Sequence, residues 1–151
     1  MDSLRGKVAI VGSADTEVGK VPGMSSTELC IEAALRALDD AGMSRNEVDG
    51  LVTCNSMAEP HMYQAEVLAE YLQIFPRYCI SASAGGGTTY SSLFHAANAI
   101  AAGVCETVLI CLADSLRSGL SRDQAMQMQS STGHREFEIP YGPTVPAYYA
   151  L

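Results

Sequence analysis

The chain has 151 residues, of which 48% are hydrophobic and 17% charged, and its formal net charge is −8. This size suits one globular domain, and the acidic balance argues against binding to a nucleic-acid backbone. We expect neither a membrane span, which needs roughly 20 apolar residues, nor a signal peptide. Five cysteines and three histidines without a Cys-x-x-Cys pair indicate reduced thiols in a cytoplasmic protein, with no disulfide framework and no metal site.

Four short apolar runs predict strands, and three segments between them predict helices. The runs hardly alternate between apolar and polar residues, which is typical of parallel strands covered on both faces. The intervening segments repeat apolar residues at helical spacing. Right-handed crossovers then give an α/β fold of β-α-β-α-β-α-β order with helices on both sheet faces. The predicted strands are 8–11, 51–54, around 78–80 and 108–112, and the helical stripes lie within 31–38, 65–72 and 93–100.

Local signals mark where these elements begin and end. Ser25 and Glu28 form a capping-box pattern before the first helix. Gly42 and Gly103 follow the first and third helices, where a left-handed residue is favoured. The connection 13–24 is longer than most strand-to-helix loops, so we expect it to have a functional role.

The character of the sequence changes after residue 113. Residues 114–147 are polar and lack a clear period, which predicts an irregular excursion over the surface. Pro146 stands where a new helix would begin, close to the last residue. We therefore expect a core over 1–113 and, over 114–151, the start of an excursion region in a chain that is cut short.

A glycine-rich turn, residues 81–89, joins the third predicted strand to the third helix. Ligands of open α/β folds gather at the carboxyl edge of the sheet, where this turn lies. Glycines allow close approach of the backbone, and amides at a helix N-terminus can face an anion or oxyanion. The P-loop, dinucleotide and G-x-S-x-G patterns are absent. The spacing alone leaves open a turn without any catalytic role.

The run from Ser83 to Ser115 resembles the nucleophile helix and following strand of thiolases, most closely the sterol-carrier-protein and lipid-transfer type. Its most specific part is SSLFHAANAIAAGVCETVLI at 91–110. The resemblance implies a thiolase-like three-layer half-domain with a mostly parallel sheet, equal to the N-terminal part of a complete family member. Shorter matches to the same family lie at 7–12, 37–42, 48–51 and 137–142.

In thiolases a cysteine at the start of this helix attacks an acyl thioester. Aligning the sequence through Leu93 and Phe94 places that cysteine at Gly86, so no catalytic residue of the family is intact here. Cys79 lies seven residues earlier, within the predicted strand. We interpret it as a small buried hydrophobe.

The missing sulfur, taken with the resemblance, implies retro-aldol cleavage of β-hydroxyacyl-CoA thioesters, such as steroid side-chain intermediates. Coenzyme A would enter as part of the substrate, without another cofactor. A base from the C-terminal half and a small OB-fold partner would complete the enzyme, so this chain alone should be inactive. Two alternatives stay open: an acetyl-CoA acetyltransferase by descent, and a non-catalytic half-domain that binds acyl-CoA, lipid or another subunit.

Substrate contacts are expected at the turn and at a loop that matches the family's substrate cover. We expect a homodimer through residues 78–90, because the resemblance places this strand at a sheet edge. The histidines are interpreted as packed or surface residues, and Met57 and Met62 as filling core or loop, with an acyl channel as the alternative. The expected substrate-binding residues are Gly85, Gly86, Gly87, Thr88, Tyr141 and Gly142.

Overall fold

The structure, a computed structural model, describes residues 4–130, 134–142 and 150. Its sheet has three parallel strands in the order β2-β1-β3. β1 spans Gly50–Thr53, β2 spans Tyr78–Ser81 and β3 spans Val108–Ile110. These match three of the four predicted strands.

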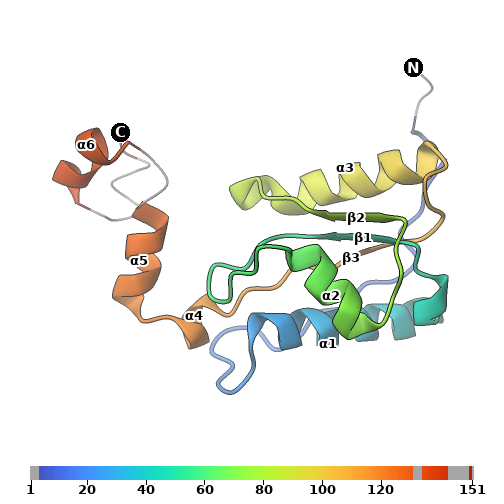
Figure 1. The fold of residues 1–151 in the computed structure, drawn as a ribbon, viewed down its shortest axis with the longest axis horizontal. Helices are drawn as coiled ribbons and strands as arrows, with labels where there is room; N and C mark the ends of the chain where they lie inside the picture. The colour runs from blue at the N-terminus through green and yellow to red at the C-terminus, as the bar shows by residue number, and fades with distance from the viewer. Residues whose placement is uncertain (1–3, 131–133, 143–149, 151) are drawn as a thin grey trace.

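Helices cover both faces of this sheet, as predicted (Figure 1). α1 (Ser26–Ala41) and α2 (Gln64–Leu72) lie on one face, and α3 (Thr88–Ala101) lies on the other. A short 3₁₀ helix, η1 (Arg45–Glu47), precedes β1, and η2 (Gly85–Gly87) precedes α3. The architecture is the expected three-layer α/β fold.

The main core lies between the sheet and the α1–α2 layer. Leu51 of β1 and Leu68 of α2 are completely buried there, and Leu109 of β3 packs in the same cluster. All four apolar positions predicted for α2 are buried: Ala65, Leu68, Ala69 and Leu72. Burial of this stripe, more than helix propensity, holds a nine-residue helix in place.

The predicted helix boundaries are confirmed. Glu28 N–H donates to Ser25 Oγ at 3.1 Å, and Ser25 N–H donates to Glu28 Oε2 at 2.8 Å. Gly42, with φ of 65°, ends α1 in the left-handed conformation, and Gly103, with φ of 72°, follows α3.

The predicted strand at 8–11 is wrong for this structure. The segment has no regular secondary structure and pairs with no strand, and Ile10 and Val11 are 76% and 65% exposed. An extended segment becomes a strand only by pairing its backbone with a neighbour. The nearest candidate edge, β3, is separated from it by an open groove.

The predicted irregular excursion after residue 113 is also wrong in part, because short helices form there. α4 (Leu116–Gly119), α5 (Arg122–Ser130), α6 (Arg135–Glu138) and η3 (Ile139–Tyr141) build an arm that extends away from the sheet (Figure 1). Reciprocal hydrogen bonds between Ser121 and Gln124 cap α5 at 2.9 and 3.2 Å, a local signal that outweighs the weak apolar period. Pro146 lies outside the described residues, and the division at residue 113 stays a prediction.

Candidate functional site at the carboxyl edge of the sheet

The glycine turn forms the start of α3. After β2 ends at Ser81, the chain enters η2 with Gly85 at φ of +53°, in the left-handed region. Thr88 Oγ1 accepts from Ala84 N–H at 3.0 Å and donates to the Gly85 carbonyl at 2.8 Å. This hydroxyl closes the turn and sets the direction in which α3 leaves the sheet edge.

Gly86 stands in open space. A Cβ built on it meets nothing within 4 Å, and its φ is outside the left-handed region. A side chain therefore fits at this position, and its absence is not a steric requirement of the fold. Within the described residues the N–H groups of Gly85 and Gly86 have no backbone partner. They are available to hydrogen-bond an anionic or carbonyl oxygen at a helix start.

Alanine substitutions should separate the two neighbouring glycines. Gly85→Ala is expected to lower the free energy of unfolding by about 1–2 kcal/mol, because a Cβ is strained in the left-handed region. Gly86→Ala should change it by less than about 0.5 kcal/mol, since the added methyl meets no atom. Urea denaturation of the two variants checks this, and equal losses would contradict the geometry of the turn.

A second cluster of polar groups surrounds Asp114, which follows β3. Asp114 Oδ1 accepts from Ser56 Oγ at 3.0 Å and from Ala58 N–H at 3.2 Å, and Oδ2 accepts from Met57 N–H at 2.8 Å. Ser26 Oγ lies 3.3 Å from Oδ1. One carboxylate thus binds the loop after β1 and the first turn of α1.

Buried hydroxyls extend this network. Ser56 Oγ lies 2.9 Å from Ser26 Oγ, and Ser115 N–H donates to Ser26 Oγ at 3.0 Å. Ser26, Ser56 and Ser115 are all buried. Sequence reasoning missed this network. The available signal was an aspartate two residues after the predicted strand 108–112, at the edge where loops of an α/β fold converge.

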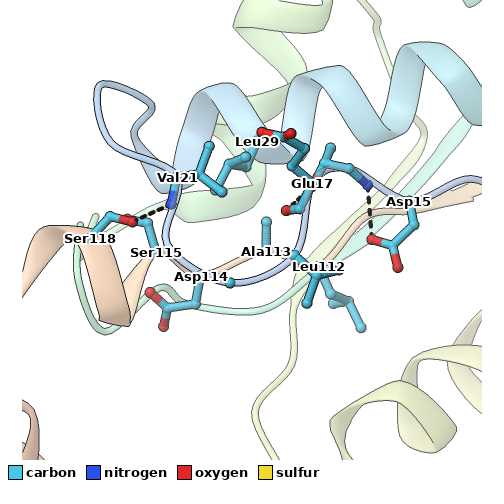
Figure 2. A pocket seen from close by; sticks show the side chains of 12 residues that line it. Asp15, Glu17, Val21, Leu29, Leu112, Ala113, Asp114, Ser115 and Ser118 are labelled. Carbon is cyan, nitrogen blue, oxygen red and sulfur yellow. Dashed lines mark hydrogen bonds between the residues drawn. The ribbon is translucent and has the colours of Figure 1, made fainter.

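A pocket of about 220 Å³ lies beside Asp114, and the long connection 13–24 forms one wall of it (Figure 2). Val21 N–H donates to Ser118 Oγ at 2.8 Å, which holds the connection against α4. Asp15, Glu17 and Asp114 line the pocket. Three carboxylates repel phosphate, so this pocket does not suit the nucleotide part of coenzyme A.

Glu59 caps the first turn of α1 from the neighbouring loop. Its Oε2 accepts from Thr27 N–H at 2.9 Å, and its Oε1 lies 3.7 Å from His61 Nε2. Burial acts to raise the pKa of Glu59, but the hydrogen bonds from Thr27 and Ser25 and the nearby His61 outweigh it. The net pKa is lowered from its usual 4.5.

This lowered pKa predicts an acid-side loss of stability. The contribution of Glu59 is complete above the ordinary glutamate pKa and is lost as the pH falls through the lower native-state pKa. Glu59→Gln should therefore flatten the dependence of unfolding free energy on pH below about 4.5. Urea midpoints across the acid range test it, with exposed Glu17→Gln as control. Parallel pH profiles for the parent chain and Glu59→Gln would contradict the capping role.

The cysteines are unsuited to nucleophilic attack. Cys79 lies within β2, as predicted, and burial raises the pKa of its thiol, with a smaller contribution from the Glu66 carboxylate. Burial likewise raises the pKa of Cys54. A thiol with a raised pKa holds little thiolate at neutral pH. Cys30 is the exception, because its side-chain hydrogen bond with Cys111 lowers the pKa of its thiol. Both Cys30 and Cys111 belong to the hydrophobic core, and Cys30 is only 2% exposed, so substrate cannot reach this thiol.

The remaining predicted residues are spread over the molecule. His95 Nδ1 lies 3.3 Å from Tyr78 Oη, so this histidine is packed between α3 and β2. His134 stacks edge-on with Phe137, and Met62 is exposed. Tyr141 ends η3, which packs on α6 at the outer end of the arm, so this residue and Gly142 are not joined to the turn by any described contact (Figure 1).

The described residues contain neither a metal-binding cluster nor a helix that could span a membrane. No group of three or more His, Cys, Asp and Glu side chains within them could hold a metal ion. None of the helices in the described part is long and apolar enough to cross a membrane.

Comparison with solved structures defines the class. The chain superimposes on the Ltp2-ChsH2(DUF35) aldolase with a TM-score of 0.76 and 31% identity, covering 98% of this chain and 37% of that one. It matches 3-oxoacyl-[acyl-carrier-protein] synthase III from Aquifex aeolicus with a TM-score of 0.60 and 20% identity, over 74% of this chain and 38% of the other, which shows the fold alone. By fold and sequence the chain is a thiolase-like half-domain.

The chain is also similar in sequence to curated proteins. The chain is 36% identical to the 17-hydroxy-3-oxo-4-pregnene-20-carboxyl-CoA lyase of Mycobacterium tuberculosis, over 95% of this chain and 38% of that protein. It is 32% identical to the steroid side-chain-cleaving aldolase of Thermomonospora curvata, over 99% of this chain and 39% of that protein. An acetyl-CoA acetyltransferase of Methanocaldococcus jannaschii is 27% identical to it, over 95% of this chain and 37% of that protein. No family model matches. The chain thus spans under two fifths of each relative.

Proposed function

We propose that this half-domain serves an enzyme that cleaves a carbon–carbon bond of a β-hydroxyacyl-CoA thioester by a retro-aldol reaction. The observation that carries the proposal is Gly86. It stands at the nucleophile position of the thiolase-like fold, and the structure leaves room there for the side chain that is missing. An enzyme that needed an acyl-enzyme would require a sulfur or oxygen nucleophile at this place.

Retro-aldol cleavage needs no such nucleophile. A base removes the proton of the β-hydroxyl, the bond between the α and β carbons breaks, and its electron pair moves into the thioester as an enolate. The β carbon leaves as a ketone or aldehyde, and protonation of the α carbon gives a shortened acyl-CoA. In this proposal the free N–H groups of Gly85 and Gly86 face the thioester oxygen and stabilise the enolate.

The other groups are assigned by their positions. Gly87 and Thr88 hold the turn, Thr88 through its two hydrogen bonds. Tyr141 and Gly142 would have to move toward the turn to cover substrate. No base faces the turn in any described contact, so we place the base in the region that the relatives have beyond the matched part. The steroid substrates named for two relatives make a bulky acyl group the first choice.

We further propose a cytoplasmic homodimer that pairs through β2. This strand has one neighbour in the sheet, and Tyr90 and Phe94 on the adjacent α3 are 78% and 64% exposed. A small OB-fold partner is proposed because a similar solved structure is named as a two-component aldolase, Ltp2-ChsH2(DUF35). Light scattering tests the dimer, and a stable folded monomer would exclude it.

The reaction is tested on the polypeptide that carries this sequence, together with its partner, using a β-hydroxyacyl-CoA with a tertiary β carbon. Mass spectrometry should find the ketone and the shortened acyl-CoA in equal amounts. Formation of a lengthened or transferred acyl group from acetyl-CoA would instead favour the acetyltransferase alternative. The 151-residue chain alone should bind an acyl-CoA without turning it over. Turnover by this chain alone would exclude the alternative in which it is a non-catalytic binding half-domain.

A further inference from the structure

Two cysteines meet in the core at the carboxyl end of β3. Cys30 belongs to the second turn of α1, and Cys111 directly follows β3. They are 2% and 3% exposed and belong to the same hydrophobic cluster. Their thiols hydrogen-bond to each other. The helix and the strand end are thus in contact through two sulfur atoms, which are the atoms that a disulfide would join.

The backbone of Cys111 is fixed on both sides. Its N–H donates to the Val52 carbonyl at 3.1 Å, and its carbonyl accepts from Thr53 Oγ1 at 2.8 Å. Thr53 is 1% exposed, and its side chain is a hydrogen-bond neighbour of both thiols. The fold therefore holds the strand-side sulfur at one place, facing the helix that carries Cys30.

The thiol pair lies one helical turn from the Asp114 network. Ser26 and Cys30 are four residues apart, so they occupy neighbouring turns on the same face of α1. Ser115 follows Cys111 by the same number of residues, and its N–H donates to Ser26 Oγ at 3.0 Å. A covalent bond between the two cysteines would therefore join the same two elements that this network joins through hydrogen bonds.

The two thiols differ in acidity. The hydrogen bond with Cys111 lowers the pKa of the Cys30 thiol, although burial acts to raise it. The hydrogen bond with Cys30 and burial together raise the pKa of Cys111 well above its usual value. Because the thiolate is the form that peroxides oxidise, Cys30 is the member of the pair that reacts first.

We propose that Cys30 and Cys111 form a redox-sensitive pair, which a hydroperoxide converts into a disulfide that locks α1 onto the end of β3. The Cys30 thiolate attacks one peroxide oxygen, the O–O bond breaks, and hydroxide leaves, so that Cys30 becomes a sulfenic acid. The Cys111 sulfur then attacks the Cys30 sulfur, and the sulfenic oxygen leaves as water with the Cys111 proton. The two sulfurs are oxidised, and both peroxide oxygens are reduced to water once the hydroxide takes up a proton.

The surroundings of the pair fit such a step. Hydrogen peroxide is scarcely larger than water, so a small local opening admits it, whereas an acyl-CoA is too large to enter. Cys54, directly after β1, is half-buried and lies close enough to Cys30 for the charge of that thiol to act on it. A reducing compartment returns such a disulfide to thiols. The proposal is independent of the reaction at Gly86, because it uses neither the turn nor a substrate.

Peptide mapping of the oxidised chain tests the proposal. The folded chain is treated with hydrogen peroxide, its remaining thiols are alkylated with iodoacetamide in denaturant, and the digest is analysed by mass spectrometry. The Cys30 and Cys111 peptides should be joined, two hydrogens lighter than their sum, and dithiothreitol should separate them. Amide exchange at Ser115 should slow by about tenfold in the oxidised chain, because the link suppresses opening between α1 and β3.

Two variants serve as the comparison. Cys111→Ser should abolish the link and leave Cys30 as a sulfenic acid that dimedone labels. Cys105→Ser removes a buried thiol outside the core cluster and should leave the link intact. Mapping of the unchanged chain decides the question even if Cys111→Ser does not fold.

Four results would overturn the proposal. The first is that no link forms at peroxide doses that oxidise the half-buried Cys54. The second is that Cys30 is linked to Cys54 instead of Cys111. The third is that the link forms only in the urea-unfolded chain, which would show that the fold does not pair the two sulfurs. The fourth is unchanged exchange at Ser115, which would show that the disulfide locks nothing.

Discussion

Asp114→Ala is expected to lower the free energy of unfolding by about 2–4 kcal/mol, among the largest effects of any single polar substitution in this chain. The carboxylate accepts hydrogen bonds from Ser56 Oγ and from the Met57 and Ala58 amides, and Ser26 Oγ lies beside it. Removing it takes an acceptor from the buried Ser56 hydroxyl and from two partly exposed amides. The penalty arises from those donors more than from the loss of a single bond.

Chemical denaturation monitored by circular dichroism measures this loss. Asp114→Asn keeps the shape and one acceptor oxygen, so it should lose less stability than the alanine variant. Asp123→Ala, at an exposed position on α5, should change stability by less than about 0.5 kcal/mol. A loss for Asp114→Ala no larger than that of this control would show that the network does not hold the loops.

Leu68→Ala is expected to cost about 2–5 kcal/mol, the range for deleting a fully buried leucine side chain. Leu68 is 0% exposed and joins α2 to the core cluster that contains Leu51 and Leu109. α2 has only nine residues, so it depends on this burial and cannot persist by propensity alone. The cavity left in the core adds to the lost transfer free energy.

The matched comparison is Leu35→Ala on α1, where the leucine is 42% exposed. It should cost less than half as much as Leu68→Ala, because less apolar area leaves water in the native state. Both variants can be measured by urea titration with the slope checked for constancy. If the two losses were equal, the core would not be centred on the α2–β1 contact.

Much of the fold could be predicted from the sequence because local and buried patterns coincide. The unbroken apolar runs of β1 and β3 mark strands covered on both faces, and the Ser25–Glu28 pair marks the start of α1. The glycine turn was placed correctly between β2 and α3. In each case the residues that form the element also carry the signal.

The wrong strand prediction and the missed network both concern contacts between distant parts of the chain. Residues 8–11 have the composition of a strand, but a strand exists only with a partner backbone, and none pairs with them in the described chain. The Asp114 network joins residues up to 89 positions apart, so no spacing rule could reveal it. Whether Tyr141 and Gly142 approach the turn depends on contacts that the sequence does not encode locally.

The proposed chemistry depends on Gly86. The turn retains a helix start with free amides and room for a side chain. The cysteines in or directly after the three strands, Cys54, Cys79 and Cys111, all have raised pKa values. The scaffold therefore presents oxyanion-type donors without a nucleophile. In the function proposed above, this combination favours cleavage through an enolate over acyl transfer.

Intact-protein mass spectrometry after incubation with acetyl-CoA tests most directly whether the site lacks a nucleophile. Because Gly86 carries no thiol, the chain should acquire no acetyl group on any cysteine. A Gly86→Cys variant serves as the positive control: its thiol at the open helix start should react with iodoacetamide faster than Cys54 or Cys79. An acetyl thioester on Cys79, or on any other native cysteine, would contradict the assignment of Gly86 to the nucleophile position.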